Sequence, residues 1–207
     1  MAKKQDKKKL EIERKFLLKR LPLLIHVEEP ALDQMWIRQY YSPEGRYRCE
    51  YRPEGSTYIL CVKTDPDPAD QSKVATVKIE DETVISYNDF RAGIKNADRF
   101  LTKKRFAFYI GEAKWDIDVY DNMQLVTAEA EMPTADFALE IPEFIQAEII
   151  MEVTGVKAFT NWSLAEPGTM NVTKSIIEDT LEEIKNASLG LIRSGFSLLH
   201  IGNKIKS

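Results

Sequence analysis

Charged and apolar residues alternate along the first two thirds of the chain, a pattern typical of β-strands with one apolar and one charged face. In residues 11–16, Glu11, Glu13 and Lys15 share one face, and Ile12 and Phe16 share the other. The same alternation recurs in residues 45–52, 57–63, 78–82, 103–109, 115–119 and 128–131. The pattern therefore predicts six or seven strands that repeat one arrangement.

Helical spacing is confined to a few segments. Residues 86–98 and 134–139 predict two short helices between strands, and residues 64–70, which contain two prolines, predict a loop. Residues 171–193 predict the clearest helix. The chain is thus strand-rich first and helical near its end.

One hairpin is suggested by the turn-forming sequence Pro-Glu-Gly-Ser at residues 53–56. With a loop at residues 54–55, Arg48 would face Cys61, and Lys63 would join the face that carries the arginines. The same count places Cys49 and Cys61 on opposite faces of the sheet, so a disulfide between them is disfavoured.

Length and charge limit the classes of protein that remain. The 207 residues suffice for one domain with an appendage, and 43% hydrophobic content excludes wholesale disorder. No apolar run is long enough to cross a membrane. The net charge of −4 argues against nonspecific binding of nucleic acid. Two cysteines and two histidines without metal-ligand spacing argue against a zinc site.

The first nine residues carry five lysines and are not followed by the apolar core of a signal peptide. We expect residues 1–9 to form a flexible basic tail and the protein to be cytoplasmic.

The charged strand faces have two interpretations. They could lie in water, with the apolar faces on an ordinary core. However, the charges segregate into carboxylate pairs two residues apart, such as Glu129 and Glu131, and into basic rows, such as Arg46, Arg48 and Arg52. A closed sheet with these faces inward would need the charges to be mutually paired, or neutralised by a polyanion and its metal ions.

These residues resemble the CYTH superfamily, also called triphosphate tunnel metalloenzymes, over residues 10–165. The sequence EIERK at residues 11–15 matches the ExExK signature of that family. Later landmarks follow in the family's order: Arg38-Gln39-Tyr40-Tyr41, Arg52, Gly55, Tyr58, Lys63, Lys78, Glu80, Glu82, Lys103, Arg105, Asp118, Glu129, Glu131, Val153, Thr154, Lys157 and Asn161.

The resemblance implies an α+β fold: an eight-stranded antiparallel barrel with helices packed outside. Residues 166–207 lie outside the resemblance, and their helical pattern predicts a C-terminal helical extension. The resemblance also implies a hydrolase that acts on a small-molecule triphosphate, inorganic or carrying a nucleoside or thiamine group. Mg²⁺ or Mn²⁺ is the implied cofactor, and carboxylate oxygens are ligands that suit these ions. No specific nucleic acid and no membrane is expected as a partner.

The resemblance also implies the roles of individual residues. Lys15 and Tyr41 match positions that help to orient the nucleophile. The expected metal ligands are Glu11, Glu13, Asp118, Glu129 and Glu131. Asp116 is not expected to be a ligand. The expected triphosphate-binding residues, which together supply the positive charge that a triphosphate needs, are Arg38, Arg46, Arg48, Arg52, Lys63, Lys78, Lys103, Arg105 and Lys157.

The sequence departs from the family pattern at two positions. Glu50 stands where the first arginine of an R-x-R pair is typical, so either Arg46 and Arg48 supply the missing charge or the pocket is weaker. Trp162 stands where a second basic residue is often found, which predicts a less basic mouth of the tunnel.

Two other functions stay open. Some members of the superfamily cyclise ATP to cyclic AMP and pyrophosphate, although the EIERK form resembles the hydrolases more closely. A non-catalytic triphosphate or polyphosphate sensor is the third alternative, and the many carboxylates disfavour it. We expect the C-terminal helix to pack on the barrel, with a homodimer interface or partner-binding helix as alternatives.

Overall fold

The computed structural model describes residues 9–167, with gaps at residues 23–31, 69–70, 73, 122 and 124. The strands in this part of the chain are β1 (Lys9–Leu18), β2 (Asp33–Ser42), β3 (Gly45–Arg52), β4 (Gly55–Thr64), β5 (Thr76–Val84), β6 (Arg99–Ile110), β7 (Ala113–Tyr120), β8 (Val126–Glu131) and β9 (Ile149–Glu152). The helices are α1 (Tyr87–Gly93), α2 (Glu143–Gln146) and α3 (Asn161–Leu164), with the 3₁₀ turns η3 (Ile94–Asn96) and η4 (Lys157–Phe159).

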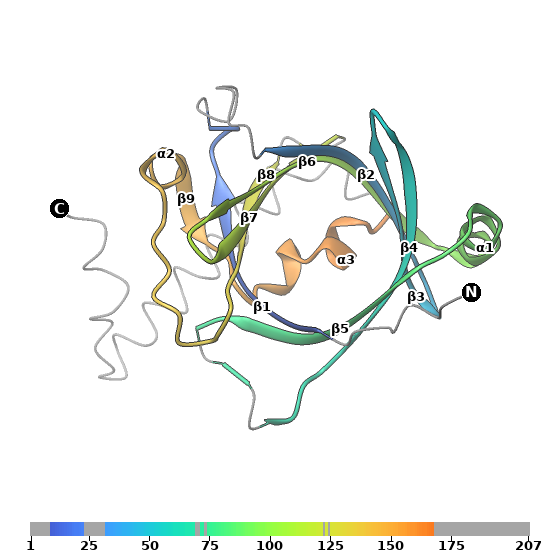
Figure 1. Cartoon of the computed structure of the whole chain (residues 1–207), viewed down its shortest axis with the longest axis horizontal. Helices are drawn as coiled ribbons and strands as arrows, with labels where there is room; N and C mark the ends of the chain where they lie inside the picture. Colours follow the sequence, from blue (N-terminus) through green and yellow to red (C-terminus); the bar gives the residue numbers. More distant parts are fainter. Residues whose placement is uncertain are drawn as a thin grey trace. The chain divides into compact units, whose positions relative to one another are not determined.

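Eight strands close into an antiparallel barrel, which confirms the predicted fold. The order around the barrel is β5-β4-β3-β2-β6-β7-β8-β1, and β1 closes the ring by pairing with β5 through residues 9–13 and with β8 through residues 13–18. Strand β9 pairs with the end of β1 and extends the sheet beyond the ring. In the view of Figure 1 the strands form a ring, with α3 drawn inside its outline.

The two faces of the strands meet different surroundings. On β7, Trp115 and Ile117 are fully buried on the outer face, where they pack with Ile145 of α2 and with Phe137. Asp116, between them in sequence, faces the interior of the barrel. The apolar faces are therefore covered from outside and the charged faces turn inward, as the resemblance implied.

A second apolar cover lies on the other side of the barrel. Phe90 of α1 packs with Tyr47 and Cys49 of β3. Ser86 begins α1 because its hydroxyl accepts a hydrogen bond from the Asp89 amide at 3.1 Å, which caps the helix. The predicted helix at residues 86–98 is thus confirmed, with its last turn in 3₁₀ geometry.

Two hairpin turns share the tripeptide Pro-Glu-Gly, at residues 43–45 and 53–55. In each turn the proline and glutamate form the loop and the glycine begins the next strand. Gly45 and Gly55 have φ angles of 146° and 147°, which favour glycine. A side chain on Gly45 would also place its Cβ 2.7 Å from the Cys61 carbonyl oxygen.

The predicted register of the second hairpin is wrong by two residues. Arg48 faces Ile59, and Arg46 faces Cys61. Because a shift of two residues preserves the side-chain alternation, each residue stays on its predicted face. Cys49 and Cys61 accordingly lie on opposite faces and are both free thiols.

The helix predicted at residues 134–139 is absent from the structure, which has a turn and extended chain there. Phe137 and Leu139 both pack against the outer face of the barrel, and a spacing of two residues brings both to the same side of an extended chain. Tertiary packing has decided the conformation of this segment.

The other predicted segments lie outside the described residues. These are the helix at residues 171–193 and residues 1–8 of the predicted tail, while Lys9 is the first residue of β1. In the described part of the chain, no helix has the length and apolar character needed to cross a membrane.

Candidate functional site

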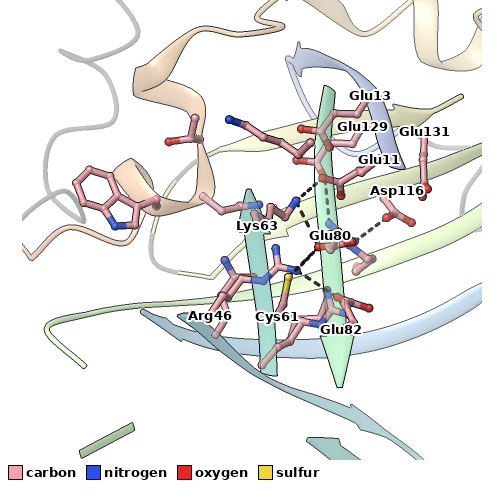
Figure 2. Close-up of a pocket in the computed structure, with 18 of the residues that line it drawn as sticks. Glu11, Glu13, Arg46, Cys61, Lys63, Glu80, Glu82, Asp116, Glu129 and Glu131 are labelled. Atoms are coloured by element: carbon pink, nitrogen blue, oxygen red, sulfur yellow. Dashed lines mark hydrogen bonds and ion pairs between the residues drawn. The ribbon is translucent and has the colours of Figure 1, made fainter. Parts of the chain in front are cut away.

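The barrel encloses a channel of about 1020 Å³ that is lined by residues from β1 to β8 and by residues 153–162. Figure 2 shows Glu11, Glu13, Lys63, Glu80 and Glu129 converging on this space. The closure of the sheet explains why they meet, since inward positions of neighbouring strands face one interior.

Most of the residues predicted for the site line this channel. They are Glu11, Glu13, Lys15, Tyr41, Arg46, Arg48, Arg52, Lys63, Lys78, Lys103, Arg105, Glu129, Glu131 and Lys157. The two exceptions are Arg38 and Asp118.

The expectation for Arg38 is wrong. Met35, Ile37, Gln39 and Tyr41 of β2 point into the channel. Arg38, at the opposite parity, is exposed on the outer surface beside Trp36. Strand alternation forbids Arg38 and Tyr41 from sharing a face.

Asp118 does not fit the role of a metal ligand. It is completely buried, and its two carboxylate oxygens accept hydrogen bonds from Lys103 Nζ at 2.5 Å and from Arg105 Nε and Nη2 at 2.7 Å each. Lys103 is itself only 1% exposed. Burial and the neighbouring Arg105 lower the pKa of Lys103 to about 8, although Asp118 opposes that change. Asp118 therefore serves as the counter-ion of a buried pair of cations.

All three nitrogens of the Arg105 guanidinium donate hydrogen bonds to carboxylates. Besides its bonds to Asp118, it donates to Asp116 Oδ2 at 2.6 Å and to Glu129 Oε2 at 3.1 Å. Lys114 Nζ also contacts Asp116 Oδ2, at 2.9 Å. The other oxygen of Asp116, Oδ1, is buried and has no hydrogen-bond partner.

A second cluster occupies the wall formed by β3, β4 and β5. Arg46 Nη2 lies 2.8 Å from Glu80 Oε1 and 3.3 Å from Glu82 Oε1. Arg48 Nη2 lies 2.9 Å from the same oxygen of Glu82. Burial would raise the pKa of Glu80, but Lys63 and Arg46 lower it to about 2. Glu80 is therefore ionised at neutral pH.

On the adjoining wall, where β1 pairs with β5 on one side and with β8 on the other, carboxylates of β1 and β8 crowd together. Lys15 Nζ pairs with Glu129 Oε1 at 2.8 Å, and Lys63 pairs with Glu11. Burial, followed by repulsion from Glu129 and Glu11, raises the pKa of Glu13 to about 8. Glu13 thus holds a proton at neutral pH in the absence of a ligand.

Opposite charges nearly cancel over the whole lining. The basic residues are Lys9, Lys15, Arg46, Arg48, Arg52, Lys63, Lys78, Lys103, Arg105, Lys114 and Lys157. The acidic residues are Glu11, Glu13, Asp33, Glu44, Glu50, Glu80, Glu82, Asp116, Glu129 and Glu131. The channel is therefore lined by acidic and basic residues in nearly equal numbers, and not by basic residues alone.

Within the described residues, one group of metal-ligating side chains has its donor atoms mutually within 4.8 Å, namely Cys61, Glu80 and Glu82. Arg46 already contacts both of these glutamates, and burial, opposed by Arg46, raises the pKa of Cys61 to about 12. A cation would have to displace the guanidinium from this group. The acidic residues of β1 and β8 do not form such a group in the described part of the chain.

Residues 153–162 contribute the remaining part of the lining. Asn161 Oδ1 accepts a hydrogen bond from the Tyr120 hydroxyl at 2.7 Å and one from Lys103 Nζ at 3.4 Å. The next residue, Trp162, stacks under the Arg99 guanidinium, which lies 3.7 Å from its ring centroid. These contacts fix α3 against β6 and β7.

Several lining residues were missed by sequence reasoning as site residues: Gln39, Glu50, Cys61, Glu80, Glu82, Lys114 and Asp116. Strand parity could have found most of them. Glu50 shares the inward face with Arg48, and Asp116 shares it with Asp118.

No protein-family model and no curated protein matches this chain. Solved structures with a similar fold include the inorganic triphosphatase NE1496, at 24% sequence identity, with a TM-score of 0.46, over 75% of this chain and 97% of that chain. The PH1819 protein from Pyrococcus horikoshii OT3 has 14% identity and a TM-score of 0.46, over 66% of this chain and 82% of that chain. A candidate adenylate cyclase from Bacillus halodurans has 16% identity and a TM-score of 0.42, over 62% of this chain and 83% of that chain.

At such identities the likeness is one of fold, so the function of this chain has to be argued from its own residues.

Proposed function

We propose that this protein is a divalent-metal-dependent hydrolase of a triphosphate, which binds inside the barrel. The observation that supports the proposal most strongly is the enclosed channel that brings guanidinium, ammonium and carboxylate groups together from eight strands. Several cations around a linear path can neutralise the roughly four negative charges of a triphosphate near neutral pH.

One unpartnered donor fits such an anion. Arg46 Nε is buried in the channel wall and has no hydrogen-bond partner. A buried guanidinium donor that lacks an acceptor costs free energy, and a phosphate oxygen would supply the acceptor. Arg46 is therefore our leading phosphate-binding residue.

The acidic residues fit a hard divalent cation in their chemistry. Carboxylate oxygens are ligands that Mg²⁺ and Mn²⁺ prefer, and Asp116 Oδ1 is a buried oxygen without a partner. We assign Glu11, Glu13, Glu129 and Glu131 to hold the metal because they match the acidic landmarks of the family, and their oxygens would have to move closer together to bind one ion. When bound, such an ion neutralises charge on the transferring phosphoryl group and lowers the pKa of a coordinated water.

Lys15 and Tyr41 are our candidates for residues that orient the nucleophile. The pKa of Lys15 is raised because Glu129 and neighbouring groups outweigh its burial, so its amine stays protonated. Burial raises the pKa of Tyr41 to about 12, and its hydroxyl oxygen accepts a hydrogen bond from Gln39 at 2.7 Å. Both groups are therefore hydrogen-bond donors at neutral pH, and neither is a general base.

Product analysis tests the proposal. The purified protein is incubated with Mg²⁺ or Mn²⁺ and, separately, with tripolyphosphate, ATP, GTP and thiamine triphosphate. We expect metal-dependent release of phosphate from at least one of them, and no release in the presence of a chelator. Pyrophosphate together with cyclic AMP from ATP would indicate a cyclase, and tight binding without turnover would indicate a sensor.

A further inference from the structure

Glu50 lies between two arginines on the channel face of β3. Its Oε1 is 3.0 Å from Arg48 Nε, and its Oε2 is 2.7 Å from Arg52 Nη1. Only 12% of the Glu50 side chain is exposed. One carboxylate therefore occupies the space between two guanidinium groups that are candidates for binding phosphate.

We propose that Glu50 competes with phosphate for Arg48 and Arg52 and so weakens the binding of a triphosphate in the channel. This inference rests on the proposed function, because it assumes that a triphosphate enters the channel. To reach the two arginines, a phosphate group has to displace the carboxylate of Glu50 or lie beside it. Both alternatives weaken the binding of a free polyanion, by loss of the ion pairs or by repulsion between like charges.

The geometry of Arg48 supports this assignment. Although Arg48 Nε is close to Glu50 Oε1, the two atoms lack the alignment of a hydrogen bond, and Nε is buried without another acceptor. The contact is thus an imperfect substitute for a well-placed anion. A phosphate oxygen that took this position would satisfy a donor that Glu50 leaves unsatisfied.

The remaining contacts of the two arginines make the position suitable for mutation. Arg48 keeps its ion pair with Glu82 at 2.9 Å, and Arg52 keeps its contact with Asp33 at 2.9 Å when the charge of Glu50 is removed. Glu50→Gln should therefore preserve the fold while it releases positive charge into the channel.

Titration calorimetry with tripolyphosphate in a chelating buffer tests the inference. We expect Glu50→Gln to bind tripolyphosphate about tenfold more tightly than the natural protein without any metal. The control is Glu54→Gln, which removes the same charge from the exposed turn of the same hairpin, outside the channel lining. Glu54→Gln should bind like the natural protein. Thermal melting checks that all variants are folded.

A double-mutant cycle links the gain to the guanidinium groups. In an Arg52→Gln background the gain from Glu50→Gln should shrink, because one of the two released cations is gone. The inference is overturned if Glu50→Gln and the natural protein bind equally, or if Glu54→Gln gains as much affinity. A titration of the natural protein in Mg²⁺ distinguishes failure of this inference from failure of the proposed function. If the protein binds tripolyphosphate in Mg²⁺ and Glu50→Gln has no effect, this inference alone is overturned. If no variant binds tripolyphosphate, with or without Mg²⁺, the proposed function is overturned as well.

Discussion

Replacement of Glu13 by glutamine should stabilise the metal-free protein, and by more as the pH rises from about 4.5 to 8. Glu13 is buried beside Glu129 and Glu11, which raises its pKa from 4.5 to about 8. A carboxyl group with a raised pKa binds more protons in the folded state than in the unfolded state between these values. The free energy of unfolding therefore falls as the pH rises from about 4.5 to 8.

The size of the effect follows from the same pKa. A rise from 4.5 to about 8 corresponds to about 5 kcal/mol at about 1.4 kcal/mol per pH unit. Water in the channel screens part of the repulsion, so we expect a measured difference of about 2–5 kcal/mol between Glu13→Gln and the natural protein at pH 9. Below about pH 4 the two proteins should be equally stable, because the glutamate is then protonated in both the folded and the unfolded state and, like glutamine, is neutral.

Urea unfolding in a chelating buffer, followed by tryptophan fluorescence, measures this difference between pH 5 and pH 9. Trp115 is a suitable reporter because it is fully buried in the outer core. Titration of Lys103 occurs in both proteins and cancels in the difference. Glu54→Gln, on an exposed turn, should give a flat profile. A stability difference that is the same at pH 5 and pH 9, or a less stable Glu13→Gln at pH 9, would refute the reasoning.

Three further predictions test the site and the packing around it. Glu129→Gln should lower metal-dependent phosphate release at least about a hundredfold, since it removes a carboxylate proposed to hold the metal, while circular dichroism shows an intact fold. Arg46→Ala should raise the KM for tripolyphosphate about tenfold, because it removes a charged phosphate donor, whereas Arg38→Ala on the outer surface should change it less than about twofold. Equal effects of the two arginine variants would contradict our placement of the binding face. Gly93→Ala should lower the free energy of unfolding by about 1–3 kcal/mol in urea titrations, because its Cβ would lie 2.1 Å from the buried Tyr47 ring.

Alternation along the strands could be predicted well from the sequence because it is a local property. The charge of residues 11–15 and 129–131 marks the inward face without any knowledge of the partner strands. The error at Arg38 came from placing a residue by its match to a family motif when its parity opposed that of Tyr41. Where the two kinds of evidence disagree, backbone geometry decides, since successive side chains must point to opposite faces.

The register of the second hairpin could also have been predicted more accurately. Proline is favoured at the second position of a type I turn and glycine at the fourth. By that rule, Pro53 and Glu54 form the loop and Gly55 pairs with Arg52, as the structure has it. The repeat of Pro-Glu-Gly at residues 43–45 is a second signal for the same turn.

The ion-pair partners could not be predicted, because they depend on which strands become neighbours. Arg46 and Glu80 are 34 residues apart, and they meet only because β3, β4 and β5 lie side by side in the barrel. Similarly, Lys15 meets Glu129 through the pairing of β1 with β8. No local pattern encodes such pairings.

These partners change what the basic residues imply about binding. From the sequence alone, the arginines would be free to neutralise the charge of a triphosphate. In the folded chain, however, their guanidinium groups already contact carboxylates. An incoming anion must therefore exchange with those carboxylates, and the carboxylates that it releases become available to a divalent cation. If the proposed function holds, triphosphate and metal should strengthen each other's binding, since each takes one member of the same ion pairs.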